Sequence, residues 1–230
     1  MAVRPAFLQV LLSRRVVRRA EAERLHAAVA RALNQESSFE HDIEAANADL
    51  ARISLEIRAC NDPKTGEAFL LLVNTKGDAL AEIATPYSAV ELVYIKSVIE
   101  AIVTAPDARF AIPSTAALQL APQAQLTKRA ASDLLQNLEQ RSWLQLSRTT
   151  GHYTLTLRAL NELDAYIRNE FEEHVLECAA CFALVTHGEQ CATDGCRGAL
   201  HTACKQWLQG GKRPCPLCQA PWHATSIGEA

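Results

Sequence analysis

Seven cysteines and one histidine between positions 178 and 218 constrain this chain more than any other feature of its sequence. These residues form four close pairs: Cys178 and Cys181, Cys191 and Cys196, His201 and Cys204, and Cys215 and Cys218. Zinc takes four ligands in a tetrahedron, and thiolates with imidazole are its usual ligands at structural sites. Eight such groups therefore predict two closed zinc sites, without the open position that a catalytic metal needs.

Disulfide bonds are the main alternative for clustered cysteines. A metal site is favoured because a histidine stands among the cysteines and no signal peptide is recognisable. Few apolar residues separate the ligands, so zinc should supply much of the folding free energy, on the order of 10 kcal/mol per site. His187 has no partner at pair spacing, and we expect it to be a solvated loop residue.

Length and composition exclude several classes of protein. A chain of 230 residues that is 49% hydrophobic and 21% charged can form two or three small domains. The longest apolar runs, such as 69–73, fall far short of the roughly 20 residues of a membrane-spanning helix, so no membrane partner is expected. A net charge of -3 gives no general attraction to nucleic acid.

The first twenty residues are rich in arginine and contain no acid, as in a mitochondrial transit peptide. A folded first helix is the preferred interpretation, because Phe7, Val10 and Leu11 repeat at helical spacing and the pattern runs on into the next helix.

Residues 1–85 are predicted to form a winged-helix domain. Three amphipathic helices carry these apolar stripes: Phe7/Val10/Leu11, Leu25/Ala28/Val29/Ala32 and Phe39/Ile43/Ala46/Leu50. A period-two pattern at Ile53, Leu55 and Ile57 then precedes the turn at 61–66 and the apolar run 69–73. Three helices followed by such a hairpin are the element order of a winged helix.

Residues 86–172 are predicted to repeat this order. A long helix carries Val90, Val93, Tyr94, Val98, Ala101 and Ile102 on one face. Residues 106–113 then form a loop, and Ser114 caps a short helix. A third helix is lined by Ala131, Leu134, Leu135 and Leu138. A second wing at 143–146 and 153–155, and a closing helix from Leu157 to about Phe171, complete the domain.

Residues between the ligands distinguish the two zinc modules that share this ligand order, the PHD finger and the RING variant. PHD fingers have an aromatic residue two positions before the seventh ligand, where this chain has Arg213. RING domains tend to have Trp-Leu shortly after the sixth ligand and Pro after the seventh, which matches Trp207, Leu208 and Pro216. Residues 173–230 therefore resemble a RING domain.

The RING resemblance implies a crossed pairing of the ligands. One zinc would bind Cys178, Cys181, His201 and Cys204, and the other Cys191, Cys196, Cys215 and Cys218. It also implies a docking surface for a ubiquitin-conjugating enzyme at Ala180, Trp207, Leu208 and Pro216. Two positions depart from the family pattern, since Ala180 replaces a larger aliphatic residue and Gln219 replaces a basic one.

The whole chain is therefore expected to be mainly α with small β wings (α+β), with two tandem winged-helix domains followed by a two-zinc cross-brace RING variant of four Cys, one His and three Cys. This arrangement resembles the non-SMC element one subunit of the SMC five-six chromosome complex. The resemblance is carried by 7–9, 55–73, 140–144 and 213–218, with Trp222 beyond.

The family resemblance implies a nuclear, chromosome-associated protein that acts in DNA repair by homologous recombination. Its implied partners are a MAGE-type winged-helix subunit, a kleisin subunit and a ubiquitin-conjugating enzyme. The implied activity is that of a RING-type E3 ubiquitin ligase, stimulated by the MAGE-type partner. Such a ligase has no catalytic nucleophile and acts by orienting the charged conjugating enzyme.

The alternative is a non-catalytic, zinc-stabilised scaffold subunit, with or without DNA binding by the winged helices. Five arginines could contact phosphates: Arg14, Arg15, Arg18, Arg19 and Arg24. The candidate recognition helix at 39–50 is acidic, which disfavours DNA reading by that helix. The lone Cys60 is expected to be a buried core residue.

Overall fold

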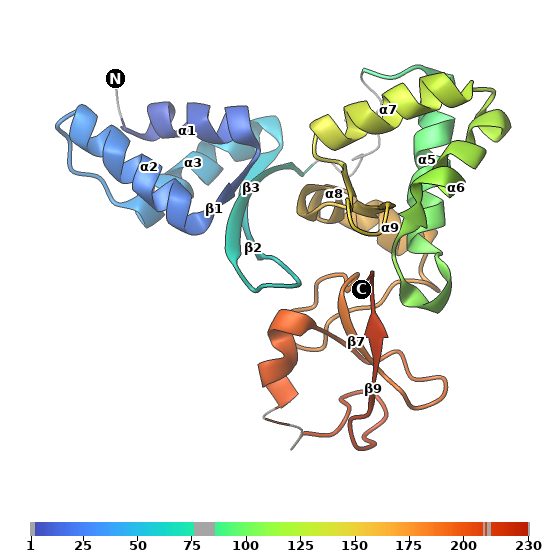
Figure 1. The fold of residues 1–230 in the computed structure, drawn as a ribbon. Coiled ribbons are helices and arrows are strands. Elements are labelled where there is room, and N and C mark those ends of the chain that lie inside the picture. The colour runs from blue at the N-terminus through green and yellow to red at the C-terminus, as the bar shows by residue number, and fades with distance from the viewer. Residues whose placement is uncertain (1–2, 76–85, 209, 211–212, 230) are drawn as a thin grey trace. The chain divides into compact units, whose positions relative to one another are not determined.

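The computed structural model describes residues 3–75, 86–208, 210 and 213–229. Contacts divide the chain into two compact units, which are Met1–Asp62 with Glu67–Gly77, and Asp78–Ala230 with the turn Pro63–Gly66. Figure 1 shows helices and small sheets in both. The boundary expected near Thr85 lies outside the described residues, and the three domain ranges stay predictions.

The first unit has the winged-helix order. Its helices are α1 (Val3–Arg14), α2 (Arg19–Ala32) and α3 (Phe39–Leu50), and its strands are β1 (Val16–Arg18), β2 (Leu55–Asn61) and β3 (Ala68–Asn74). The antiparallel sheet has the order β1-β3-β2. Strand β1 was not predicted, because three residues are too few to show a period of two. The expectation for Ile53 was wrong, since this residue ends a 3₁₀ turn and is 64% exposed.

Helix α2 buries only part of the stripe that its apolar residues predict. Leu25 and Val29 are half-buried, and Leu25 packs against the core, whereas Ala28 and Ala32 are exposed. The fully buried residues of α2 include His26, which has a polar partner inside the unit. Its Nε2 lies 2.8 Å from Oδ2 of Asp42, one of the residues whose acidity argued against DNA binding by α3.

The His26–Asp42 pair is enclosed on all sides by the helices of the unit. The imidazole makes edge contacts with Phe7 and Phe39, at ring-centroid distances of 5.3 and 5.5 Å. The Ser37 hydroxyl donates a second hydrogen bond, of 2.5 Å, to Oδ2 of Asp42. Burial raises the pKa of Asp42, but the hydrogen bonds from Ser37 and His26 outweigh it, and the pKa falls below its usual value.

Replacement of Asp42 by Asn should destabilise α2 and α3 by about 2–4 kcal/mol, because His26 and Ser37 would lose a buried charged acceptor. Since the pKa of Asp42 is lower in the folded state, its contribution is present above the unfolded-state pKa of about 3.9 and is lost as the pH falls through the folded-state value. Hydrogen exchange of α2 and α3 peptides in the full chain measures the loss. The exposed Glu44→Gln is the control, and equal protection in both variants would contradict the assignment.

The second unit begins with another winged-helix order. Its helices are α5 (Ala89–Val103), α6 (Ser114–Gln119) and α7 (Lys128–Gln140), and its strands are β4 (Ile112–Pro113), β5 (Leu144–Leu146) and β6 (His152–Leu155). The sheet has the order β4-β6-β5. The stripe predicted on α7 is confirmed, since Ala131, Leu134, Leu135 and Leu138 are all buried.

Three details of this region differ from the predictions. Tyr94, Val98 and Ile102 of the stripe predicted on α5 are buried, but Val90 and Val93 are 39% and 52% exposed. Ser114 does not cap α6 but is its first residue, after Pro113. The closing helix is two short helices, α8 (Leu157–Glu162) and α9 (Asp164–Glu170), which meet at Leu163.

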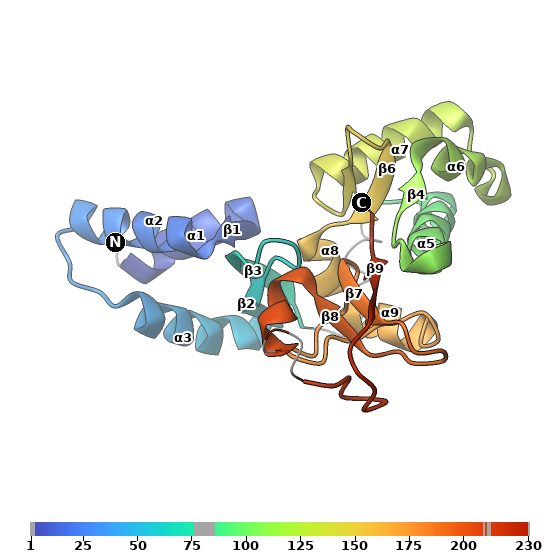
Figure 2. The same ribbon diagram turned by 60° about the horizontal axis from the view of Figure 1, so that its bottom comes forward.

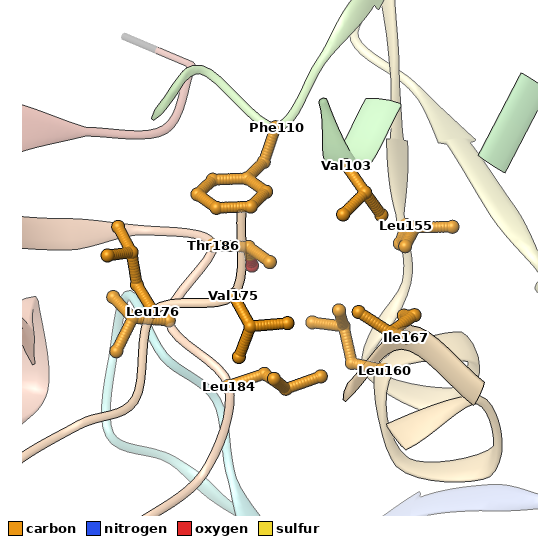
Figure 3. A pocket seen from close by; sticks show the side chains of 10 residues that line it. Val103, Phe110, Leu155, Leu160, Ile167, Val175, Leu176, Leu184 and Thr186 are labelled. Atoms are coloured by element: carbon orange, nitrogen blue, oxygen red, sulfur yellow. The ribbon is translucent and has the colours of Figure 1, made fainter. Parts of the chain in front are cut away.

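The C-terminal module is a small sheet with loops on both sides. Strands β7 (Gly188–Cys191), β8 (Ala199–His201) and β9 (Ala224–Ile227) pair in the order β8-β7-β9 (Figure 2), and a 3₁₀ helix covers Thr202–Leu208. An apolar recess joins this module to the second winged helix, where Phe110, Leu160 and Ile167 face Leu176 and Leu184 (Figure 3). The predicted fold class is confirmed. No described helix is long and apolar enough to cross a membrane.

Candidate metal centre

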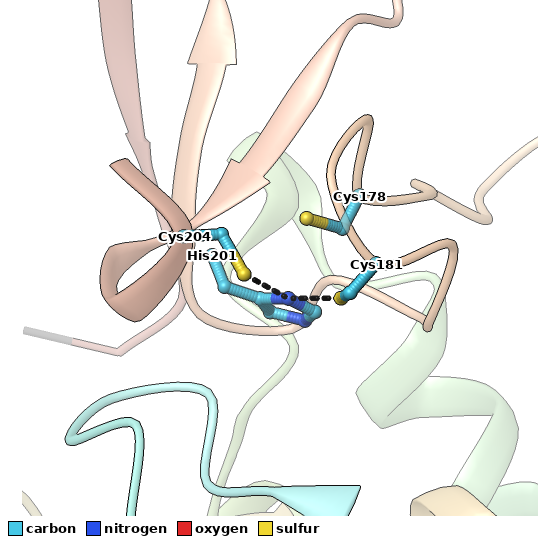
Figure 4. Close-up of side chains that lie close together, drawn as sticks. All are labelled: Cys178, Cys181, His201 and Cys204. Carbon is cyan, nitrogen blue, oxygen red and sulfur yellow. Dashed lines mark hydrogen bonds between the residues drawn. The ribbon is translucent and has the colours of Figure 1, made fainter. Parts of the chain in front are cut away.

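The eight predicted ligands come together as two groups of four. The first contains Cys178, Cys181, His201 and Cys204 (Figure 4), and the second contains Cys191, Cys196, Cys215 and Cys218. Within each group the ligand atoms lie within 4.8 Å of one another. All eight cysteines of the chain are free thiols. Each group could hold one metal ion, and the grouping is the crossed one that the RING resemblance implies.

His201 presents Nδ1 to the sulfur atoms of the first group. Nδ1 lies 3.3 Å from Sγ of Cys181 and 3.9 Å from Sγ of Cys204. On the other side of the ring, Nε2 lies 2.9 Å from the carbonyl oxygen of Leu184. Because a carbonyl only accepts, Nε2 carries the proton and Nδ1 is left with its lone pair for a metal. Zn–S and Zn–N bonds of about 2.3 and 2.0 Å in a tetrahedron would place S and N about 3.6 Å apart, between the two observed distances.

The sulfur atoms of the second group have the spacing of a tetrahedral thiolate site. Sγ of Cys191 lies 3.8 Å from Sγ of Cys218, and Sγ of Cys196 lies 3.6 Å from Sγ of Cys215. Tetrahedral Zn–S bonds of about 2.3 Å require about 3.8 Å, whereas a disulfide requires about 2.05 Å. The donor set and its spacing therefore fit zinc.

Gly198 is a requirement of the second group that sequence reasoning missed. A Cβ atom at this position would lie 2.7 Å from Sγ of Cys215, so any side chain would displace a ligand. The backbone N–H of Gly198 also donates to Sγ of Cys196 at 3.4 Å, which offsets part of a thiolate charge. Its place two residues after a ligand was the available signal.

The thiols in each group oppose one another's ionisation. Burial raises the pKa of Cys178, but its interaction with the His201 side chain and hydrogen bonds from nearby backbone N–H groups lower it to about 6. Burial and the charges of Cys178 and Cys181 then raise the pKa of Cys204 to about 12. Without a cation, one thiolate keeps its neighbours protonated, so all the ligands of a group ionise together only when a metal ion balances their charge.

The sheet of the module holds ligands of both groups. Cys191 is the last residue of β7 and belongs to the second group, whereas His201 is the last residue of β8 and belongs to the first. The two strands pair antiparallel, with Gly188 opposite His201, so these ligands lie at opposite ends of one ladder. The other ligands come from outside the three strands, with Cys204 on the 3₁₀ helix Thr202–Leu208, so a metal ion bound to each group would fix both ends of the sheet.

Substitution of one ligand in either group, Cys181→Ser or Cys196→Ser, should reduce the bound zinc from two ions per chain to at most one, because serine is a poor zinc ligand. Elemental analysis of the purified full chain measures this. Cys60→Ser is the matched control, because Cys60 lies on β2 and should leave both ions bound. Two ions retained in either ligand variant would contradict the assignment of that group.

The four residues predicted to dock a conjugating enzyme do not share one environment. Leu208 is 6% exposed and packs in the core of the module, so its expected role as a surface contact is wrong. Ala180 is half-buried against the same core, and Pro216 is also half-buried. Trp207 is half-buried, with the Arg213 guanidinium 5.0 Å from its ring centroid.

Two large apolar side chains that sequence reasoning did not select are more exposed than these four. Phe182 follows the ligand Cys181 and is 68% exposed, and Leu217 lies between the ligands Cys215 and Cys218 and is 66% exposed. Their positions directly beside ligands in the metal loops were the available signal.

The contrast between Leu208 and Leu217 can be measured. Leu208→Ala should destabilise the C-terminal module by about 2–5 kcal/mol, because it leaves a cavity in a small core. Leu217→Ala should change stability by less than about 0.5 kcal/mol, because the side chain is exposed. The rate of zinc loss to a chelator reports on both variants, and equal rates would show that Leu208 is not a core residue.

The N-terminal arginines have acidic partners, which weakens the case for phosphate binding. Arg14 pairs with Glu21, Arg18 lies 3.2 Å from Glu67, and Arg19 pairs with both Glu23 and Glu40. A phosphate would compete with a carboxylate at each of these positions.

Two single residues differ from expectation. Cys60 is only half-buried, and burial raises the pKa of its thiol to about 12, so it is unreactive at neutral pH. His187 is half-buried rather than solvated, and it belongs to neither metal group.

Comparison with known proteins decides the family. Residues 4–163 match the family described as the Nse1 non-SMC component of the SMC5-6 complex, and this match spans more than half of the chain. The chain belongs to the Nse1 family. The match ends before the first metal ligand, so the likeness of the C-terminal module comes from longer comparisons.

Whole-chain relatives carry the Nse1 name in distant organisms. Non-structural maintenance of chromosomes element 1 of Schizosaccharomyces pombe is 29% identical over 90% of this chain and 87% of its own length. The human homologue is 28% identical over 94% of this chain and 82% of its own length. A solved chain from an Nse1-Nse3-Nse4 complex superposes with a TM-score of 0.82 at 25% identity, and the match covers 96% of each chain.

Proposed function

We propose that this Nse1 chain is a RING-type E3 ubiquitin ligase subunit of the SMC5-6 complex, acting in DNA repair by homologous recombination. The observation that carries the proposal is the pair of crossed, closed four-ligand groups in one module. Closed groups have an architectural role, because no ligand position is left for substrate or water. The module would therefore act by holding a partner enzyme rather than by forming a covalent intermediate.

The metal ions in this proposal are two zinc ions. Three thiolates with one imidazole, and four thiolates, are donor sets that zinc prefers. When bound, the ions would fix the loops at 178–181 and 215–218, and with them Ala180, Pro216 and their exposed neighbours. The 3₁₀ helix Thr202–Leu208 carries both the ligand Cys204 and Trp207, so its position would depend on the first ion.

The proposed reaction is ubiquitin transfer from a conjugating enzyme to a lysine. In a ligase of this kind, the module binds the conjugating enzyme and favours a reactive orientation of its ubiquitin thioester. A lysine amine then attacks the thioester carbonyl, the enzyme's cysteine leaves as thiolate, and ubiquitin ends in an amide bond to the lysine. The residues proposed to contact the conjugating enzyme are Trp207 and Pro216, with Ala180 beside them.

The proposed partners are a MAGE-type winged-helix subunit and a kleisin subunit, and the proposed location is the nucleus, on chromosomes. Support comes from the solved Nse1-Nse3-Nse4 complex, one chain of which resembles this one over 96% of its length. The domain division proposed for these roles is 1–85 and 86–172 for the winged helices and 173–230 for the zinc module.

The second candidate function is a non-catalytic, zinc-stabilised scaffold. It is favoured by the burial of Leu208 and by the small size of Ala180, which together reduce the apolar surface offered at the expected docking positions. Loss of an aliphatic contact of isoleucine size removes about 2 kcal/mol of apolar burial, which weakens docking roughly thirtyfold. DNA binding has less support, because three of the five N-terminal arginines, Arg14, Arg18 and Arg19, are paired with acids.

Discharge of ubiquitin from charged conjugating enzymes onto free lysine tests the proposal. The zinc-loaded chain, alone and with its MAGE-type partner, should accelerate discharge from at least one enzyme of a panel. Trp207→Ala should reduce the acceleration about tenfold or more, because a half-buried aromatic ring is a typical interface anchor. The variant must retain both zinc ions, which elemental analysis verifies. No acceleration by the unmodified chain in either setting would reject the ligase and leave the scaffold.

A further inference from the structure

Phe182 is the most exposed large apolar residue among those that the structure describes, at 68%. It follows the ligand Cys181 and has a φ of 62°, in the left-handed region that residues other than glycine seldom adopt. A phenylalanine in this conformation, directed to solvent from a metal loop, contributes nothing to the core of the module. It therefore needs an explanation outside the fold of the chain.

The backbone of Phe182 is held on both sides, so the ring cannot turn inward by a change in the loop. Its N–H donates to the carbonyl oxygen of Cys178 at 2.8 Å. Its own carbonyl oxygen accepts a hydrogen bond of 2.9 Å from Nη2 of Arg168. The first bond closes the loop around the metal group, and the second ties this loop to helix α9.

Arg168 connects the second winged helix to the first metal loop. Its Nε bonds within α9, and its Nη1 and Nη2 bond to the loop. Nε lies 3.0 and 2.9 Å from the two carboxylate oxygens of Asp164, which fixes the guanidinium on α9. Nη1 lies 2.6 Å from Oε2 of Glu177, which directly precedes the ligand Cys178. Because Nη2 donates to the carbonyl oxygen of Phe182, the side chain binds the loop at both of its ends.

The surroundings of Ala180 and Phe182 are opposite in kind. Ala180 carries one methyl group and packs against the core of the module, whereas Phe182 carries a full ring that faces solvent. Both belong to the same metal loop, two positions apart. The apolar surface that a RING loop offers to its partner is therefore present here, but at position 182 rather than 180.

We propose that Phe182 is the apolar contact of the first metal loop with the ubiquitin-conjugating enzyme, in place of Ala180, and that Arg168 is a positioning residue that holds it there. This inference rests on the ligase function proposed above. It implies that the second winged helix determines the geometry of the docking surface through one side chain.

Discharge measured against the concentration of the conjugating enzyme tests the role of Phe182. Phe182→Ala should weaken the apparent affinity about tenfold or more, and Phe182→Leu, which keeps an apolar surface, should weaken it by no more than about threefold. The control is Ile53→Ala, since Ile53 is similarly exposed, at 64%, but lies in the first unit. All variants are compared in the full chain with two zinc ions bound.

The outcomes separate this inference from the proposed function. If the unmodified chain accelerates discharge and Phe182→Ala does so with unchanged affinity, the inference is wrong and the ligase stands. If the unmodified chain accelerates nothing, both fail. Weakening in Ile53→Ala equal to that in Phe182→Ala would also overturn the inference, because the effect would then not belong to the metal loop.

Arg168→Ala and Arg168→Lys test the positioning role, with the exposed Arg148→Ala as control. Both Arg168 variants should weaken the apparent affinity, since a lysine cannot reach Asp164, Glu177 and Phe182 together. Hydrogen exchange of peptides spanning 178–184 should quicken in both while two zinc ions stay bound. A lower melting temperature with unchanged affinity and unchanged loop exchange would show a purely structural residue and overturn the positioning role.

Discussion

The gathering of four cysteine and histidine pairs into two potential metal sites, with the pairs taken alternately along the chain, is the constraint on which the C-terminal quarter of this protein depends. The module has a small core around Leu176, Leu200 and Ile227, and its strands are only three or four residues long. Such a sheet is not stable by itself. The crossed groups lie at its two ends, and metal ions bound there would balance the mutual repulsion of the thiolates and hold the sheet together. Trp207, Phe182 and Pro216 each lie within three residues of a ligand of these groups.

Packing does not separate this module from the second winged helix. Leu184 lies in the module but belongs to the apolar cluster of the winged helix, whereas Phe110 lies in the winged helix and belongs to the cluster of the module. Polar contacts add to this interface. Arg197, beside the ligand Cys196, donates to the carbonyl oxygens of Glu172 and Val175, and the N–H of Gly228 donates to the carbonyl oxygen of Ala108. The proposed boundary at residue 172 therefore separates two folds rather than two independently packed bodies.

Because of ion pairs, the surface charge of the N-terminal unit differs from the one that its sequence suggests. Its first arginines occur within twenty residues that contain no acid, a pattern typical of a phosphate-binding surface. In the folded unit the acids come from α2, α3 and Glu67, just before β3, and lie beside Arg14, Arg18 and Arg19. Asp42 was counted as part of a repulsive acidic surface, yet it is buried with His26. The density of charged residues along the sequence therefore overestimated both the basic and the acidic surface. The residues that pair in the folded unit are distant from one another in the chain.

The sequence by itself determined the features that depend on local spacing. Close Cys and His pairs reveal metal ligands because adjacent ligands must reach one ion from a single turn, and the stripe on α7 reveals its buried face because helix periodicity is local. Only the tertiary structure decided that His26 of α2 is buried, that the short strands β1 and β4 exist, and that Leu208 is buried while Phe182 is exposed. These depend on partners far along the chain: Asp42 for His26, the sheet neighbours for β1 and β4, and Arg168 for the loop of Phe182. No periodicity within one segment carries that information, because the free energy that selects each conformation comes from contacts between segments.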